Sequence, residues 1–179
     1  MTGVEDAPSG TPTGSTLIPS ARQGASMTDL MDTYIENRQL VQPNHTNNYD
    51  MAHGGNVMKW MDIVGALSAM RFAGETCVTA RMNQVDFVQP IPRGDTALIQ
   101  SYVYDAGRTS VKVRLKTFRE DPQTGEREPT TESYFVYVAI DDVREPTPVP
   151  DLTVDTEEGE RLRDEALAGE TGRTASETN

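Results

Sequence analysis

The segment that most constrains this chain is an apolar run that two glycines open. It extends from Gly54 to Met70, and Asp62 is its only acidic residue. The run is typical of a mostly apolar helix, which we expect to end near Gly74. A helix of this kind must bury much of its surface, so the rest of the fold has to be arranged around it.

Asp62 is the residue of greatest chemical interest in this run. Its neighbours at helical spacing are mostly small and would leave a hollow beside the carboxylate: Met58, Gly65, Ala66 and Ala69. A charge in an apolar wall costs free energy unless something uses it. The glycines at the helix start offer N–H groups that can hold a developing negative charge. A base, a pocket and an anion hole this close together are typical of a hydrolase, whereas the alternative is a solvated pair of Asp62 with Lys59.

The length, net charge and composition of the chain limit the kinds of molecule that it can bind. The chain has 179 residues, enough for one domain with a modest core. Its formal net charge of −12 argues against nucleic acid and anionic membranes as partners. Three lysines stand against thirteen arginines. An acidic, lysine-poor composition resembles that of halophilic cytosolic proteins, and an ordinary acidic protein with acidic tails is the alternative.

Cysteine usage and the absence of leader signals predict a cytoplasmic location. Cys77 is the only cysteine, so we expect no intrachain disulfide and no cysteine metal cluster, which suits a reducing interior. The N-terminus lacks the basic and apolar segments of a signal peptide. The apolar run carries Lys59 as well as Asp62, so we expect no membrane span.

The composition divides the chain into three parts. Residues 1–26 are mostly Gly, Ser, Thr, Pro and Ala, and we expect a disordered tail there. Residues 27–150 are expected to form the folded domain. Residues 151–179 are expected to form an acidic C-terminal tail that is partly helical, over 155–168.

Within 27–150, hydrophobic periodicity predicts five strands beside the helix. We expect strands at 31–41, 77–88, 96–104, 109–119 and 131–140, with polar loops at 44–53 and 120–129. This order indicates an α+β fold in which one apolar helix packs against one antiparallel sheet. Both faces of the last strand are apolar, which favours a dimer or a larger assembly.

A set of short motifs runs through this domain in a fixed order. The motifs are Asn47, His53-Gly54-Gly55, Asp62, residues 85–91 and residues 107–111. Together they resemble the hotdog-fold acyl-CoA thioesterases, and most closely the group of brain-type acyl-CoA hydrolases and small bacterial acyl-CoA thioesterases, over residues 31–140. One departure is Asp50, where this family often has glycine. The resemblance implies the hotdog fold, an antiparallel sheet wrapped around one central helix.

The resemblance also implies an assembly and a ligand. It implies a homodimer, or a hexamer that is a trimer of dimers, with active sites at the dimer interface. There, Asn47 of one subunit would work with Asp62 of the other. Coenzyme A would enter as part of an acyl-CoA substrate, and no cofactor would be needed. The positions at which this family meets its substrate are His53, Gly54, Thr79, Arg81, Arg108, Thr109 and Ser110.

Asn47, Asp62 and Gly55 form the predicted catalytic set, because thioester hydrolysis needs a base for water and donors for the oxyanion. Asp62 is the candidate base, or alternatively a nucleophile that forms an anhydride. The Asn47 amide is a candidate to hold the water or the thioester oxygen, although asparagine is also common in turns of this composition. The N–H groups near Gly54 and Gly55 are the candidate oxyanion donors.

The remaining polar side chains suggest phosphate contacts and no metal. Cationic residues on and before one strand could gather the phosphates of coenzyme A, or could be a solvated strand face: Arg108, Lys112, Arg114 and Lys116. His45 and His53 are the only histidines. They lack further ligands at metal-binding spacing, so we expect no metal site.

These features predict an acyl-CoA thioesterase that hydrolyses a fatty acyl-CoA to free fatty acid and coenzyme A. Two other functions stay open. A hotdog hydratase or dehydratase would act on an acyl thioester and would use His53 together with an acid. A non-catalytic acyl-CoA-binding module would keep the pocket without turnover.

Overall fold

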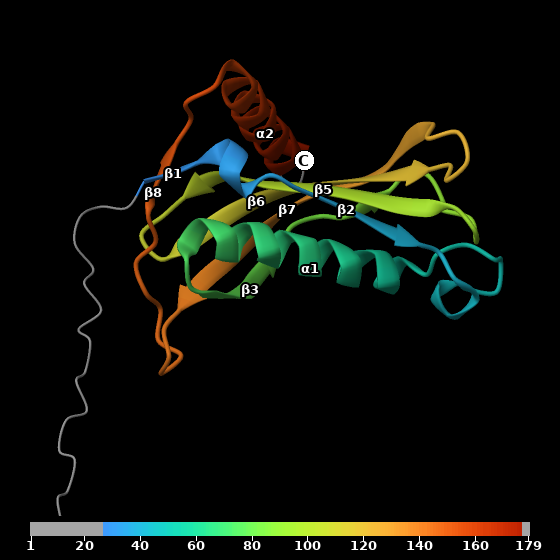
Figure 1. The fold of residues 1–179 in the computed structure, drawn as a ribbon, viewed down its shortest axis with the longest axis horizontal. Helices are drawn as coiled ribbons and strands as arrows, with labels where there is room; N and C mark the ends of the chain where they lie inside the picture. Colours follow the sequence, from blue (N-terminus) through green and yellow to red (C-terminus); the bar gives the residue numbers. More distant parts are fainter. Residues whose placement is uncertain (1–26, 177–179) are drawn as a thin grey trace, which may run out of the picture.

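The computed structural model describes residues 27–176, so the tail expected at 1–26 lies outside the described residues. An antiparallel sheet with the strand order β2-β5-β6-β7-β3 wraps around helix α1, and β4 adds to β7 (Figure 1). The predicted α+β hotdog architecture is thereby confirmed. The elements are β1 (Met27–Asp29), β2 (Ile35–Leu40), α1 (Gly54–Ala73), β3 (Thr76–Met82), β4 (Asp86–Phe87), β5 (Thr96–Ala106), β6 (Ser110–Glu120), β7 (Arg127–Ile140), β8 (Asp151–Thr153) and α2 (Glu157–Ser176), with 3₁₀ turns at Leu30–Thr33 and Pro43–His45.

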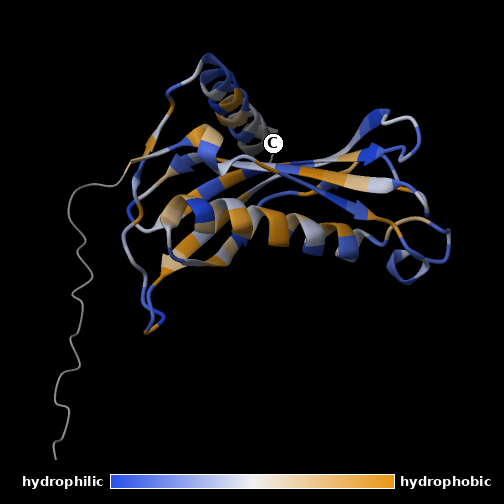
Figure 2. Ribbon diagram, in the orientation of Figure 1, coloured by the Kyte–Doolittle hydropathy of each residue, from blue (hydrophilic) through white to orange (hydrophobic). Residues whose placement is uncertain are grey.

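Helix α1 has the bounds that the sequence predicted, because both of its ends are capped. The His53 side chain accepts a hydrogen bond from the Gly55 N–H, and Gly74 ends the helix in the left-handed conformation at φ 67°. One face of the helix is buried against β5, β6 and β7, where it meets side chains such as Val113 and Phe135. Apolar residues therefore gather where α1 meets the sheet (Figure 2).

Two of the expected strands differ from the structure. The strand expected at 77–88 is divided into β3 and β4, which both pair with β7, and the β3 register shifts between Thr79 and Arg81. The strand expected from residue 31 begins only at Ile35. Leu30–Thr33 instead makes a 3₁₀ turn, which the Asp29 side chain caps by accepting a hydrogen bond from the Met31 N–H at 2.9 Å.

Helix α2 covers the face of the sheet opposite to α1 (Figure 1). The sequence placed residues after 150 in an acidic tail with a short helix. In the structure, β8 pairs in parallel with β1, and α2 packs on the sheet through Leu162 and Ala166. A second small core forms beneath α2 from Leu30, Tyr102, Tyr104, Tyr134, Leu162 and Ala166. Tyr134 therefore packs under this helix, which accounts for part of the second apolar face of β7.

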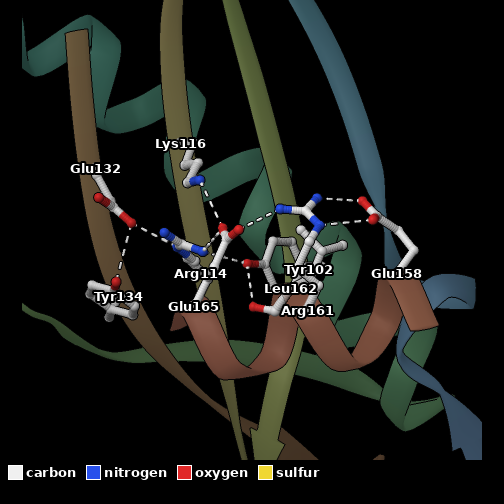
Figure 3. A network of polar contacts seen from close by, with 9 residues as sticks. All are labelled: Tyr102, Arg114, Lys116, Glu132, Tyr134, Glu158, Arg161, Leu162 and Glu165. Carbon is white, nitrogen blue, oxygen red and sulfur yellow. Dashed lines mark hydrogen bonds and ion pairs between the residues drawn. The ribbon is translucent and has the colours of Figure 1, made fainter. Parts of the chain in front are cut away.

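A network of charges and hydroxyls fixes α2 to the sheet (Figure 3). The Tyr102 hydroxyl donates to the Leu162 carbonyl at 2.9 Å, and the Arg114 guanidinium donates to the Tyr102 hydroxyl at 2.8 Å. Arg114 also pairs with Glu132 at 2.7 Å and with Glu165 of α2 at 3.2 Å. Because Arg114 is buried, these partners are needed to offset the loss of its hydration.

The two edges of the sheet differ in character. The β2 edge is charged, since Arg38 pairs with Glu36 at 2.8 Å and with Glu120 at 2.7 Å. The β3 edge is apolar and open, with Val78 43% exposed and Met82 37% exposed. Neither helix within residues 27–176 combines the length and the apolar character that crossing a bilayer requires.

Candidate active site

Asp62 lies in the third turn of α1, half-buried, with two hydroxyl donors at one of its carboxylate oxygens. The Thr79 hydroxyl of β3 donates to Oδ1 at 2.6 Å, and the Tyr137 hydroxyl of β7 lies 3.3 Å from the same atom. Tyr137 also lies 3.1 Å from the Asp62 main-chain oxygen. Thr79 and Tyr137 are cross-strand partners in the β3–β7 pairing, so both side chains reach the helix from the same face of the sheet.

The hollow predicted beside Asp62 is filled by Tyr137. A Cβ atom on Gly65 would overlap the Tyr137 hydroxyl, so glycine at this position makes room for the phenol rather than for a ligand. Burial, and after it the negative charge of Asp62, raise the pKa of Tyr137 well above its usual range. The phenol therefore remains a protonated donor at working pH. Sequence reasoning missed this residue, whose only signal was a tyrosine among inward-facing apolar residues of the strand.

Asn47 shapes the loop before α1 with the oxygen of its amide. Oδ1 accepts hydrogen bonds from the Tyr49 N–H at 2.9 Å and from the Met51 N–H at 3.3 Å. Asp50 in this loop has φ 57°, in the left-handed region that aspartate tolerates better than most residues. The departure from glycine at Asp50 is thus compatible with the turn. Since the loop uses the Asn47 oxygen, the amide NH₂ is the group that can meet a ligand.

A pocket of about 450 Å³ opens between this loop and the start of α1. Its lining includes Asn47, Gly54 and apolar side chains such as Val57, Phe87 and Ile91. The Phe87 ring lies 3.5 Å from the place where a Gly54 Cβ would stand, so the helix start is in close contact with the aromatic wall. The pocket therefore joins an apolar lining to an amide and a helix N-terminus.

The two glycines at the helix start have different partners. The Gly55 N–H donates to Nδ1 of His53 at 3.1 Å, whereas Gly54 lines the pocket. Asp62 does not line this pocket. It lies eight residues after Gly54, which places it ~12 Å further along the helix axis at 1.5 Å per residue. One copy of the chain therefore keeps the carboxylate and the pocket apart.

The other predicted substrate residues lie away from this pocket. Arg81 and Arg108 are exposed, and Thr109 and Ser110 lie at the turn between β5 and β6. The Arg108 carbonyl accepts from the Val149 N–H at 3.0 Å, and the Thr109 carbonyl accepts from the Ala139 N–H at 3.0 Å. Among the predicted substrate residues, Thr79 lies against Asp62, whereas His53 and Gly54 lie at the start of α1.

Three of the cations expected to gather phosphates have other partners. Lys112 pairs with Glu170 at 3.2 Å, Lys116 with Glu165 at 3.6 Å, and Arg114 with Glu132 and Glu165. Arg114 and Lys116 face α2, on the side of the sheet away from α1 (Figure 3), and Lys112 reaches Glu170 of the same helix. The expectation that they form a phosphate-binding face is wrong, because the carboxylates of α2 and β7 already neutralise them.

The histidines serve the loop and the helix start. Nδ1 of His45 accepts from the Gln42 N–H at 3.2 Å, and its ring packs edge-on against Trp60 at a centroid distance of 5.1 Å. Across residues 27–176, no group of three or more His, Cys, Asp or Glu side chains is arranged to hold a metal ion.

Comparison with known proteins identifies the family. The thioesterase superfamily model matches residues 49–126. An uncharacterized acyl-CoA thioester hydrolase of Bacillus subtilis is 38% identical over 127 residues, which cover 71% of this chain and 74% of that protein. An apo-hexameric acyl-CoA thioesterase has 34% identity and a TM-score of 0.74, covering 84% of this chain and 96% of that one.

A second similar structure is the acyl-CoA hydrolase of Staphylococcus aureus, solved with butyryl coenzyme A, coenzyme A and coenzyme A disulfide. It has 28% identity and a TM-score of 0.75, and the match covers 86% of this chain and 93% of that one. That hydrolase has also been solved with alanine in place of one asparagine, one aspartate and one threonine. From the Bacillus relative and the structural matches together, the present chain belongs to the hotdog-fold acyl-CoA thioester hydrolases of the thioesterase superfamily.

Proposed function

We propose that this protein hydrolyses acyl-CoA thioesters to a carboxylic acid and coenzyme A, with Asp62 as the general base. The observation that carries the proposal is the Asp62 carboxylate, which is held on an apolar helix by the hydroxyls of Thr79 and Tyr137. The names of the similar proteins support the same reaction. In the S. aureus hydrolase, the three positions replaced by alanine have the same spacing along the chain as Asn47, Asp62 and Thr79.

The geometry of Asp62 suits the removal of a proton from water. Oδ1 carries both hydroxyl contacts, so Oδ2 is the oxygen left to accept a proton. The resulting hydroxide adds to the thioester carbonyl, and the Asn47 NH₂ and the Gly54 N–H stabilise the oxyanion. The tetrahedral intermediate then expels the thiolate of coenzyme A, which takes the proton held by Asp62.

We further propose that each active site is shared between two copies of the chain. Within one copy, Asp62 is too far along α1 to act on a carbonyl held at Gly54. Exposed apolar side chains lie on α1 and on the edge strand β3: Ile63, Leu67, Val78 and Met82. A two-fold contact through this surface would bring Asp62 of one copy to the pocket of the other. The hexameric relatives support an assembly of this kind.

The pocket favours an apolar acyl group, and a panel of substrates tests this directly. Acyl-CoA substrates from acetyl to stearoyl are supplied to the full chain, and released thiol is trapped and measured. We expect saturable thiol release from at least one fatty acyl-CoA. Asp62→Asn keeps the size of the side chain and removes the base, so we expect turnover to fall by at least ~100-fold. Wild-type turnover in Asp62→Asn would remove this residue from the mechanism.

The same assay separates the competing functions. A hydratase would add water to an enoyl-CoA without releasing thiol, and its histidine base would have to be His53, whose Nδ1 instead caps the Gly55 N–H. A binding module would take up acyl-CoA without turnover. Either result would overturn the proposed hydrolysis. We also propose that no cofactor takes part, so dialysis against a chelator is expected to leave thiol release unchanged.

A further inference from the structure

The contact between Tyr137 and α1 is built into the packing of two elements. Tyr137 is fully buried, and it is the cross-strand partner of Thr79 in the β3–β7 pairing. Its hydroxyl enters the space left by Gly65, one turn of α1 after Asp62. There it lies 3.1 Å from the Asp62 main-chain oxygen and 3.3 Å from Oδ1. A single phenolic proton is thus shared between the helix backbone and the carboxylate of the same residue.

This contact restricts the rotation of the Asp62 carboxylate. A carboxylate on a helix surface can turn about its side-chain bonds and offer either oxygen. Here the hydroxyls of Thr79 and Tyr137 approach Oδ1 from neighbouring strands, so rotation away from this position breaks two hydrogen bonds at once. Oδ1 then keeps both contacts, and Oδ2 keeps a fixed direction relative to the helix.

We propose that Tyr137 is a positioning residue of the active site: through its hydroxyl it fixes which oxygen of the Asp62 carboxylate acts as the base. The inference rests on the proposed function, because it assigns a task to a residue behind the proposed base. Tyr137 is fully buried, and its hydroxyl contacts the main-chain oxygen and the carboxylate of Asp62. Its effect on the reaction passes through Asp62 alone.

Tyr137→Phe tests the proposal, since it removes one oxygen atom from a buried ring. We expect kcat for thiol release to fall about tenfold while KM changes by less than about twofold. We also expect the acid limb of the pH–rate profile to move to higher pH, because a hydrogen-bond donor to a carboxylate favours its ionised form. Unchanged kcat with an unchanged acid limb would overturn the proposal.

The movement of the acid limb separates positioning from a purely structural role. A variant that merely loosens the core would lose stability or active protein without moving that limb, and such a result would also count against the proposal. The other titratable group near the phenol is Cys77, and burial raises its pKa to about 11, so it stays neutral over the acid range. Lys59 precedes Asp62 by one turn and is present in both proteins being compared.

Tyr134→Phe is the matched control. Tyr134 is as deeply buried as Tyr137 and lies on the same strand, but its hydroxyl contacts Glu132 at 3.1 Å on the opposite face of the sheet. Removing that hydroxyl is expected to leave kcat and the pH profile as in the wild type. A similar loss in both variants would show a general effect of weakening β7 and would overturn a specific role for Tyr137.

Gly65→Ala provides a second and independent test. The added methyl group overlaps the Tyr137 hydroxyl and must displace it, so this variant is expected to reproduce the shift of the acid limb. In the Tyr137→Phe background the hydroxyl is absent, and the methyl group meets the ring carbon at 3.1 Å and Leu115 at 3.2 Å, so it should change kcat far less than it does in the wild-type background. Full additivity of the two changes in kcat would overturn the proposal.

These results also separate the inference from the proposed function. If Asp62→Asn abolishes thiol release while Tyr137→Phe leaves the rate and its pH dependence unchanged, hydrolysis through Asp62 stands and the positioning role fails. If Asp62→Asn retains full activity, the proposed base itself fails, whatever Tyr137→Phe does.

Discussion

The hydroxyl of Thr79 donates a hydrogen bond of 2.6 Å to Oδ1 of Asp62, and it joins the edge strand β3 to the central helix. Thr79→Val keeps the shape and the strand preference of the side chain while removing this donor. We expect kcat for thiol release to fall about tenfold. Thr76→Val is the control, because Thr76 is an exposed threonine of the same strand; equal rates in the two variants would argue against a role for the bond.

A shared active site predicts recovery of activity when two inactive variants are mixed. Asn47→Ala and Asp62→Ala are each expected to be inactive. After subunit exchange, a mixed dimer contains one site with both residues intact, so it should show about half the activity of a wild-type dimer. Measuring thiol release before and after exchange checks this.

The doubly substituted chain, Asn47→Ala with Asp62→Ala, makes the matching control. Mixed with wild-type chain, it forms dimers in which each shared site lacks one residue, so activity should fall below that of the wild-type fraction alone. Two results would place both residues of a site in one copy. One is activity in this second mixture that stays equal to that of the wild-type fraction. The other is no recovery of activity in the first mixture despite proven exchange.

Cys77 is predicted to react slowly with thiol reagents. Burial, and after it the charge of Glu75, raise the pKa of this thiol to about 11. At pH 8, roughly one thiol in a thousand is then ionised. We expect iodoacetamide to label the native protein slowly, with a rate that rises about tenfold per pH unit up to pH 10.

Protein unfolded in guanidinium chloride is the control for this labelling and should react rapidly. The same pKa difference bears on stability. The folded-state pKa lies above the unfolded one, so the stabilisation is complete below about pH 8.5 and is lost as the pH rises toward 11. Rapid labelling of native protein at pH 8 would contradict the burial of the thiol.

Glu120 is predicted to stabilise the fold in its ionised form. Its hydrogen bond with Arg38, and a second one with Arg127, lower the pKa of this carboxyl. The stabilisation is therefore present above the ordinary glutamate pKa and is lost as the pH falls through the lower folded-state value. We expect Glu120→Gln to lower Tm by about 3 °C at pH 7 and to have little effect below about pH 3.

Glu128→Gln serves as the control for Glu120, since Glu128 is 61% exposed and, within residues 27–176, forms an ion pair with Arg119 alone. Its effect on Tm should be smaller at every pH. A pH-independent loss of Tm in Glu120→Gln would mean that packing, rather than charge, is responsible.

The docking of α2 can be tested with two glycines of that helix. A Cβ on Gly169 would overlap the Tyr134 hydroxyl, so Gly169→Ala is expected to cost about 1–3 kcal/mol in unfolding free energy. A Cβ on Gly172 meets no atom within 4 Å, so Gly172→Ala should stabilise the protein by up to about 1 kcal/mol. Denaturant titration measures both, and equal effects would contradict the docking described here.

The central helix and its carboxylate could be predicted because their signals are local. Capping by His53 and Gly74 and the apolar run between them lie within one stretch of sequence. The partners of Asp62 were harder to find, since Tyr137 lies 75 residues away. Its position depends on the register that sets it opposite Thr79, and periodicity alone gives the face of a strand but not its register.

Helix α2 shows a different limit of sequence reasoning. Its buried side chains include only a few apolar residues, Leu162 and Ala166 among them, within a strongly acidic segment. Such a pattern is typical of a solvated tail. Its acidic residues instead meet the cations of β6, whose own pattern had suggested a site for phosphate. Each charged face looked solvent-exposed because its complement lay far along the chain.

The unequal edges of the sheet decide how many copies can be joined through it. When two copies associate through their β3 edges, each edge covers the other, so no third copy can add at this place. Continued growth would need the β2 edge, where Glu36 and Arg38 already serve internal ion pairs and discourage a strand from another molecule. The exposed apolar β3 edge can thus take part in association without allowing the chain to polymerise into a filament.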